Sequence, residues 1–183
     1  MLSPIDRKTG LVTIELEPGL NAMSCPASGG LWLRPSAFWK WRESQPDPTP
    51  LGPVDDGQDL APGNDSPAGK RCPEDGAFLI RHRVGHGLYF HLDRCGHCGG
   101  IWFDRDEWEA VKQRGLTRDL HLIFTSAWQA EVRRQEAIDR QHGRLAERLG
   151  TETFEKLKGV RGWIDSHPRR GELLAYLKGD NDV

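Results

Sequence analysis

The sequence contains no apolar run approaching the ~20 residues that a membrane-spanning helix needs. Its first residues also lack the basic start and apolar stretch of a secretion signal. Cysteine is scarce, with four residues in 183, and three of these lie between residues 71 and 106. Few cysteines in a metal-like arrangement fit a reducing compartment better than a disulfide framework. We therefore expect a soluble, cytoplasmic protein.

Basic residues are missing between residues 43 and 69, where six acidic side chains give the segment a charge of −6. The net charge of the chain is −2, so the remaining residues sum to +4. This weak basicity is far from that of a dedicated nucleic-acid-binding domain. The same stretch holds six of the twelve prolines, which disfavour helices and central strands. With so little apolar content, residues 44–70 are predicted to form a linker.

Two short turns carry the residues with metal-binding chemistry. The first is Cys72-Pro-Glu-Asp75 followed by glycine, and the second is Cys95-Gly-His-Cys98 followed by two glycines. Such a turn places two side chains on one ion, and Zn²⁺ accepts thiolates and carboxylates in a tetrahedron. The pattern therefore predicts a structural zinc held by four ligands, Cys72, Asp75, Cys95 and Cys98.

Nineteen residues separate the two turns, and they alternate in polarity as a β-hairpin does. The expected strands cover residues 77–83 and 88–92, joined through Gly85-His86-Gly87. A hairpin brings both turns to the same end, as a zinc ribbon requires. We therefore predict a zinc ribbon over residues 71–104.

The fourth ligand has alternatives in the sequence. Four histidines lie close to the turns and could replace Asp75, namely His82, His86, His91 and His97. The absence of a stable zinc is another alternative. Against it, a ribbon of about 35 residues has little core of its own. Structural zinc contributes about 10–16 kcal/mol to modules of this kind.

The second half of the ribbon is repeated earlier in the chain with an offset of 70 residues. Cys25 aligns with Cys95, Trp32 with Trp102, and a Gly-Gly pair precedes each tryptophan. Ser28 stands where the later copy has Cys98, so the first copy has lost a ligand. Coincidence in a short window is the alternative explanation. We predict a degenerate ribbon copy within residues 1–43, which should not hold zinc by itself because no cysteine pair precedes Cys25.

Helical periodicity dominates the chain after residue 104. Apolar residues recur at three- and four-residue spacing in one long helix beginning at Thr117 and continuing to Arg148. Asp104 is predicted to cap a preceding helix, and Gly150 separates the long helix from two shorter ones. On the helix after Gly150, five apolar residues are expected to face inward: Phe154, Leu157, Val160, Trp163 and Ile164. A short helix over residues 36–43, capped by Ser36, is also expected.

The stretch from Cys72 to Asp104 resembles the TFIIB-type zinc-ribbon family of small bacterial and organellar proteins. That family has a CPxC turn, a hairpin, and then CxxCGGxW before an acidic helix start, which Arg105-Asp-Glu-Trp108 matches here. The resemblance implies a structural zinc held by Cys72, Cys95 and Cys98. This chain departs from the family pattern at Asp75.

The predicted fold class is α+β: a zinc ribbon (71–104) and a degenerate copy (1–43), joined by a linker (44–70) and followed by helices (105–183). Such a chain is expected to be a non-enzymatic adaptor for a protein partner. Nucleic-acid binding is the alternative, based on positive charges around the ribbon: Lys70, Arg71, Arg81, Arg83 and Arg94. No catalytic motif accompanies the cysteines, so we do not expect an enzyme.

Overall fold

The computed structural model describes residues 1–45, 66 and 68–179. The chain forms two compact units, Met1–Val132 and Arg133–Val183. The first unit includes the predicted ribbon, its predicted copy and the helices as far as residue 132. Most of the predicted linker lies outside the described residues. Together with the sheet and helices described below, these units make the chain an α+β protein, as predicted.

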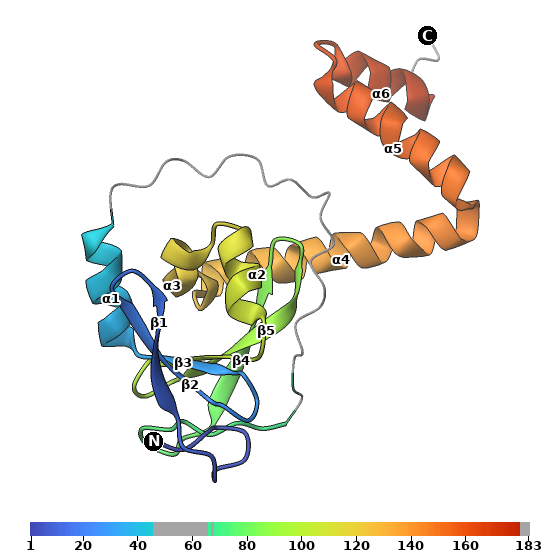
Figure 1. Cartoon of the computed structure of the whole chain (residues 1–183). Coiled ribbons are helices and arrows are strands. Elements are labelled where there is room, and N and C mark those ends of the chain that lie inside the picture. Colours follow the sequence, from blue (N-terminus) through green and yellow to red (C-terminus); the bar gives the residue numbers. More distant parts are fainter. Residues whose placement is uncertain (46–65, 67, 180–183) are drawn as a thin grey trace. The chain divides into compact units, whose positions relative to one another are not determined.

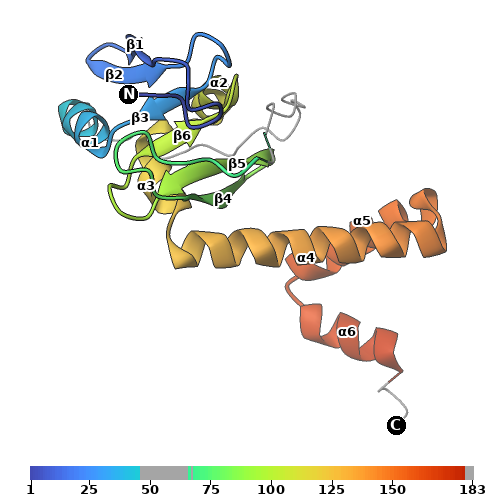
Figure 2. The ribbon, with the colours of Figure 1, turned by 90° about the horizontal axis from the view of Figure 1, so that it is seen from below.

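The first unit is built on one six-stranded antiparallel sheet (Figures 1 and 2). Its strands lie in the order β1-β2-β3-β6-β5-β4. Their bounds are β1 Val12–Glu17, β2 Leu20–Ser24, β3 Leu31–Leu33, β4 Leu79–Gly85, β5 Leu88–Cys95 and β6 Ile101–Phe103. The strands of the expected hairpin after residue 77 are therefore present, with β5 reaching as far as Cys95. The N-terminal hairpin turns at Pro18-Gly19, and Gly19 adopts the positive φ that such a turn requires.

The two halves of the sheet meet at the repeated tryptophans. β3 pairs with β6 antiparallel, and Trp32 stands directly opposite Trp102. Both indole rings are fully buried. A Cβ on Gly100 would lie 2.1 Å from Cζ2 of Trp32, and a Cβ on Gly30 would lie 2.1 Å from Cζ2 of Trp102. The Gly-Gly-x-Trp segments are thus complementary: the glycine of each copy makes room for the tryptophan of the other.

This close approach predicts that Gly100→Ala is strongly destabilising. Neither the rigid, buried indole of Trp32 nor the paired β6 backbone can move aside, and overpacking of this kind costs about 1–3 kcal/mol or more. Gly96→Ala is the matched control, because the added methyl would meet only Cδ1 of Ile80, at 3.6 Å. Urea unfolding should show a lower midpoint for Gly100→Ala and little change for Gly96→Ala. Equal midpoints for the two variants would contradict the packing of these rings.

Three helices pack with the sheet around one hydrophobic core. They are α1 (Pro35–Ser44), α2 (Glu107–Gln113) and α3 (Leu120–Ile123), the last preceded by the 3₁₀ turn Thr117–Asp119. From α1, Phe38 and Trp41 enter this core while Trp39 remains 41% exposed. The predicted caps are wrong for two helices. α1 begins after Arg34 with Pro35 in its first turn, and α2 begins after Asp106, because the Asp104 side chain is engaged elsewhere.

The predicted long helix from Thr117 is interrupted before α4 (Ser126–Leu149). The break falls at Phe124-Thr125, where the Thr125 hydroxyl accepts a hydrogen bond from the backbone N–H of Trp128. Threonine is a good helix cap, so its hydroxyl starts a new helix where the apolar pattern alone runs on. The Trp128 indole then donates to the carbonyl of Val84, which fixes the start of α4 against the β4–β5 hairpin.

The second unit contains the rest of α4 together with α5 (Thr151–Ser166) and α6 (Arg170–Lys178). On α5 only Phe154 and Ile164 of the five residues expected inside are buried. Leu157, Val160 and Trp163 are each about half exposed, which corrects the prediction. α5 contacts the short helix α6, and these three side chains nevertheless keep about half of their surface exposed. Across the described residues, no helix has both the length and the apolar character to span a membrane.

Candidate metal centre

Two loops of the same shape carry the predicted ligands. In loop 72–77, the N–H of Cys72 donates to the carbonyl of Ala77 and the N–H of Gly76 to the carbonyl of Cys72. In loop 95–100, Cys95 and Gly99 donate to Gly100 and Cys95 in the same way. Gly76 and Gly99 both have φ near 75°, which the reversal requires and which other residues rarely adopt. Because β4 pairs with β5 as far as Leu79 and Cys95, the sheet holds the two loops side by side.

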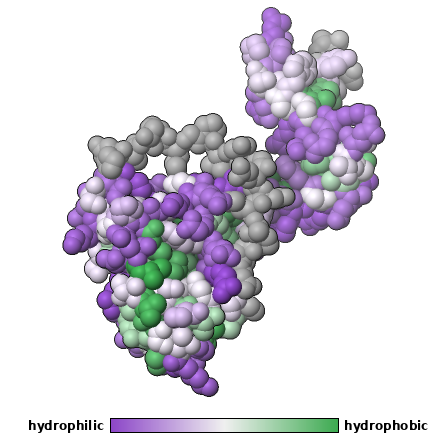
Figure 3. Space-filling model, viewed as in Figure 1, coloured by the Kyte–Doolittle hydropathy of each residue, from purple (hydrophilic) through white to green (hydrophobic). Residues whose placement is uncertain are grey.

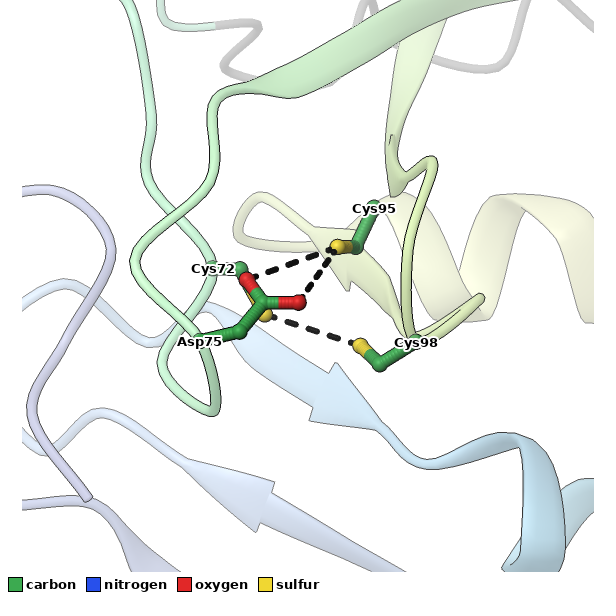
Figure 4. A group of neighbouring side chains, drawn as sticks. All are labelled: Cys72, Asp75, Cys95 and Cys98. Carbon is green, nitrogen blue, oxygen red and sulfur yellow. Dashed lines mark hydrogen bonds between the residues drawn. The ribbon is translucent and has the colours of Figure 1, made fainter.

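The four predicted ligand side chains point toward one another from these loops (Figure 4). Their sulfur and carboxylate atoms all lie within 4.8 Å of one another. Sγ of Cys72 is 3.6 Å from Sγ of Cys98, and Sγ of Cys95 is 3.4 Å from Oδ2 of Asp75. A tetrahedron with Zn–S bonds of ~2.3 Å places its sulfurs ~3.8 Å apart. The group therefore has the composition and spacing of a structural Zn²⁺ site.

The backbone around the site prepares these atoms for a metal. Sγ of Cys72 accepts a hydrogen bond from the N–H of Glu74, and Sγ of Cys98 accepts one from the N–H of Gly100. Oδ1 of Asp75 accepts one from the N–H of Ala77 at 2.9 Å. Such contacts from outside the coordination sphere orient ligands and stabilise their anionic forms.

Burial and hydrogen bonding act on the thiols and the carboxyl in opposite directions. Burial raises the pKa of Cys72 and also that of Cys98. Hydrogen bonds from the Ala77 backbone and the Cys72 side chain lower the pKa of Asp75, which is thus a carboxylate at neutral pH. Zinc must displace the protons of the thiols, so zinc affinity is expected to fall as the pH falls.

The histidines that could have replaced Asp75 have other surroundings. His82 lies edge-on to Phe124, His86 lies over Trp128, and His91 bonds to Arg81. The side chain of His97 is 78% exposed, with Nδ1 3.8 Å from the carboxylate of Asp75. Among the described residues, the group of converging ligand atoms contains an aspartate and no histidine.

A buried ionic cluster lies beyond the metal group, and sequence reasoning missed it. Nζ of Lys70 is 2.5 Å from Oδ2 of Asp93 and 2.9 Å from Oδ2 of Asp104. All three side chains are at least 96% buried. The indole N–H of Trp102 donates to Asp104, so the cluster also holds the tryptophan of β6. No spacing motif marks these residues in the sequence. Lys70 follows the proline-rich segment, where a lysine is normally expected at the surface.

The fold and the converging ligands together define a zinc ribbon. Residues 71–114 match a family model described as transcription factor zinc-finger, of the TFIIB zinc-ribbon type. This match confirms the resemblance seen in the sequence and extends it through α2, although it covers less than half of the chain. No curated protein and no solved structure matches the chain.

Replacing Asp75 tests the fourth ligand directly. Asp75→Ala is expected to lower zinc affinity by at least about tenfold, since even the loss of a residue that only supports a ligand costs ~10–100-fold. Asp75→Cys should raise the affinity by completing a four-thiolate set. The affinities can be measured by competition with a chromophoric chelator. His97→Ala is the control and should bind zinc as the unaltered chain does; a loss confined to His97→Ala would make histidine the fourth ligand.

Proposed function

We propose that this protein is a non-enzymatic zinc-binding adaptor, in which Cys72, Asp75, Cys95 and Cys98 hold a structural zinc and the C-terminal helices bind a protein partner. Four protein ligands support a structural rather than a catalytic metal, because a catalytic zinc keeps a position open for water or substrate. In this proposal the zinc closes the ends of β4 and β5, and the rigid sheet unit carries the helices that engage the partner.

The observation that carries the proposal is the apolar surface of α5 and α6. Within the described part of the second unit, these helices bury few large apolar side chains, and five are at least 49% exposed. They are Leu157, Val160, Trp163, Tyr176 and Leu177. Monomeric proteins rarely leave large apolar side chains gathered at the surface unless another molecule covers them. Apolar side chains are visible on the surface of both units, among predominantly polar ones (Figure 3).

A pair of matched variants tests the adaptor role in the native cell. Leu157→Ser/Trp163→Ser replaces two of the three exposed apolar side chains of α5 without altering the buried Phe154 and Ile164. Tyr89→Ser is the control, because Tyr89 is also a highly exposed aromatic but lies on β5 of the ribbon. The same proteins should co-purify with the unaltered chain and with Tyr89→Ser, and should be lost with the double variant. Recovery of the same proteins with all three chains would exclude α5 as the binding surface.

A second candidate function is binding of single-stranded nucleic acid, favoured by the outer surface of the β4–β5 hairpin. Arg81 and Arg83 lie there together with the 74% exposed ring of Tyr89. Cations interleaved with an exposed aromatic suit a phosphate backbone with stacked bases. Two of the five cations expected to contribute are placed differently: Lys70 is buried in ion pairs, and Arg94 lies over the ring of Phe124.

Fluorescence anisotropy with labelled single-stranded DNA and RNA at low salt decides this alternative. Binding that weakens steeply with added salt and is reduced by Tyr89→Ala would support it. Absence of binding at low salt would remove it and leave the adaptor role.

A further inference from the structure

The first 45 residues contain a loop that matches loop 72–77 in its backbone hydrogen bonds. In loop 3–9, the N–H of Ser3 donates to the carbonyl of Thr9 at 2.8 Å, and the N–H of Arg7 to the carbonyl of Ser3 at 3.0 Å. Loop 72–77 has the corresponding bonds at 2.8 and 3.0 Å. Arg7 has φ 55° where the later loop has Gly76, so the reversal is kept although glycine is not. Ser3 therefore occupies the position of Cys72, and Asp6 that of Asp75.

The side chains of this loop repeat the contacts of the metal-ligand loop. Oγ of Ser3 accepts from the N–H of Ile5 at 3.3 Å, as Sγ of Cys72 does from Glu74 at 3.3 Å. Oδ1 of Asp6 accepts from the N–H of Lys8 at 3.0 Å, as Oδ1 of Asp75 does from Ala77 at 2.9 Å. The sequence signal was present but short: Ser3-Pro-Ile-Asp6 beside Cys72-Pro-Glu-Asp75.

Loop 25–30 matches loop 95–100 in the same manner. Cys25 and Gly29 donate to the carbonyls of Gly30 and Cys25, both at 2.8 Å. Oγ of Ser28 accepts from the N–H of Gly30 at 3.2 Å, where Sγ of Cys98 accepts from Gly100 at 3.5 Å. Isolated bridges Leu2↔Gly10 and Arg71↔Phe78 precede the corresponding hairpins. The pairing of β3 with β6, centred on Trp32 and Trp102, is what a twofold relation between the two copies produces.

We propose that residues 1–45 form a complete second ribbon whose four ligand positions, Ser3, Asp6, Cys25 and Ser28, are closed by hydrogen bonds in place of a metal. Zinc takes cysteine, histidine and carboxylate ligands, and a neutral serine hydroxyl is not among them. Two of the four positions are serine, so the donor set does not fit zinc.

The polar groups at these positions already have partners. The carboxylate of Asp6 accepts bonds from Lys8 and from the backbone and hydroxyl of Thr9, all within its own loop. Cys25 is fully buried beside the two serines. Burial acts to raise the pKa of its thiol, but hydrogen bonds with Ser28 and Ser3 outweigh this effect and lower it. The serine hydroxyls have geometric partners as well, since Ser3 accepts from the N–H of Ile5 and Ser28 from the N–H of Gly30, so each loop is closed by its own hydrogen bonds.

The metal-free copy also contacts the metal-binding one, which explains why its shape is kept. Nε of Arg34 and Nε1 of Trp32 both donate to Glu74, inside loop 72–77, at 2.7 and 3.3 Å. In return, Nε of Arg105 donates to the carbonyl of Ser28 at 3.2 Å. The first ribbon thus contacts loop 72–77 and supports it, and Arg105, the residue that follows the second ribbon, contacts loop 25–30.

The test is to restore the lost ligands in the full chain. Ser3→Cys/Ser28→Cys gives the first ribbon the same three thiols and one carboxylate as the second. The metal-to-protein ratio after Zn²⁺ loading should rise by one relative to the unaltered chain, and titration with Co²⁺ should show one more equivalent of thiolate-to-metal absorption. Ser126→Cys/Ser166→Cys is the control, because it adds two exposed cysteines outside both ribbons; its ratio should not change.

An unchanged ratio in the restored variant, with native circular dichroism, would overturn the inference. So would a ratio of two in the unaltered chain. If the restored variant is unfolded without metal, titration with Co²⁺ still tests the second site. The inference is contradicted if the variant does not fold at any Co²⁺ concentration. It is also contradicted if folding is complete at the same number of Co²⁺ equivalents per chain as in the unaltered protein. The added equivalent is read as a difference, so it does not depend on how the unaltered chain holds its own zinc.

Discussion

Cys95→Ser is expected to abolish zinc binding and unfold the ribbon, whereas Cys25→Ser leaves the zinc content unchanged. The two cysteines occupy the same position in the two copies, and both are fully buried. They differ in their neighbours. Cys95 faces the carboxylate of Asp75, in the group of converging ligand atoms, while Cys25 lies beside the serines at positions 3 and 28. The pair therefore separates the effect of losing a ligand from the effect of losing a buried thiol.

The expected difference is large because metal binding and folding are coupled. Structural zinc contributes about 10–16 kcal/mol in small zinc-binding peptides, which is comparable to the whole stability of a typical domain. Loss of this contribution should separate loop 72–77 from loop 95–100 and unfold β4 and β5, the strands that these loops join to the metal group. The shared core around Trp32 and Trp102 should retain residual structure.

Metal analysis of the purified variants and amide hydrogen exchange measure both parts of this prediction. Protection of β4 and β5 should be lost in Cys95→Ser and kept in Cys25→Ser. Adding a strong chelator to the unaltered chain should reproduce the exchange pattern of Cys95→Ser. Equal zinc contents in the two variants, whether high or near zero, would contradict the ligand assignment.

Lys70→Met is expected to lower the free energy of unfolding by about 3–5 kcal/mol, the usual cost of removing one partner from a buried ion pair. The ammonium of Lys70 faces two buried carboxylates, those of Asp93 and Asp104. Burial alone would lower the pKa of Lys70, but the hydrogen bonds with these aspartates outweigh it and raise the pKa. Burial raises the pKa of Asp93, and Lys70 offsets this only in part. Without the lysine, two negative charges remain in the interior.

The pH dependence distinguishes this electrostatic effect from simple loss of packing. In Lys70→Met the pKa of Asp93, which burial already raises, loses the opposing effect of the ammonium, so the folded state binds more protons and gains stability as the pH falls. The deficit relative to the unaltered chain should therefore shrink as the pH falls toward the unfolded pKa of aspartate, ~3.9. Lys112→Met is the control, because the side chain of Lys112 is 46% exposed and pairs with a single carboxylate, that of Glu17, so its loss should matter less. A deficit that does not change with pH would contradict the charged state of this cluster.

The metal group could be predicted from the sequence because its information is local. A tight turn sets the distance between Cys72 and Asp75, or between Cys95 and Cys98, through only three peptide bonds. Alternating polarity over the intervening residues then predicted the hairpin that brings the turns together. The repeated Cys25–Trp32 segment could also be recognised from the sequence. Where two backbones approach closely, few other residues can replace the glycines and the tryptophan, so both copies keep them.

Other features depended on residues far apart in the chain. The apolar pattern after Thr117 did not reveal the break at Thr125. A capping hydroxyl changes the backbone at a single residue and leaves the spacing of the apolar residues unchanged. The exposure of Leu157 and Trp163 depends on what covers α5, which helical periodicity alone does not specify. The sequence alone suggests that Lys70 is a surface cation. The sheet places Asp93 and the end of β6 beside it, which buries the lysine in ion pairs.

The sequence predicted the zinc ribbon and the four side chains that converge in the metal group, and it showed the repeat at Cys25–Trp32, because short turns and alternating strands are specified over a few residues. The fold was needed to recognise loop 3–9 as the counterpart of loop 72–77, since serine in place of cysteine removes the chemical signal and leaves only the backbone hydrogen bonds. It also decided that the two copies join through β3 and β6. That pairing rests on Gly30 and Gly100 receiving the opposite indoles, a contact between residues about seventy positions apart.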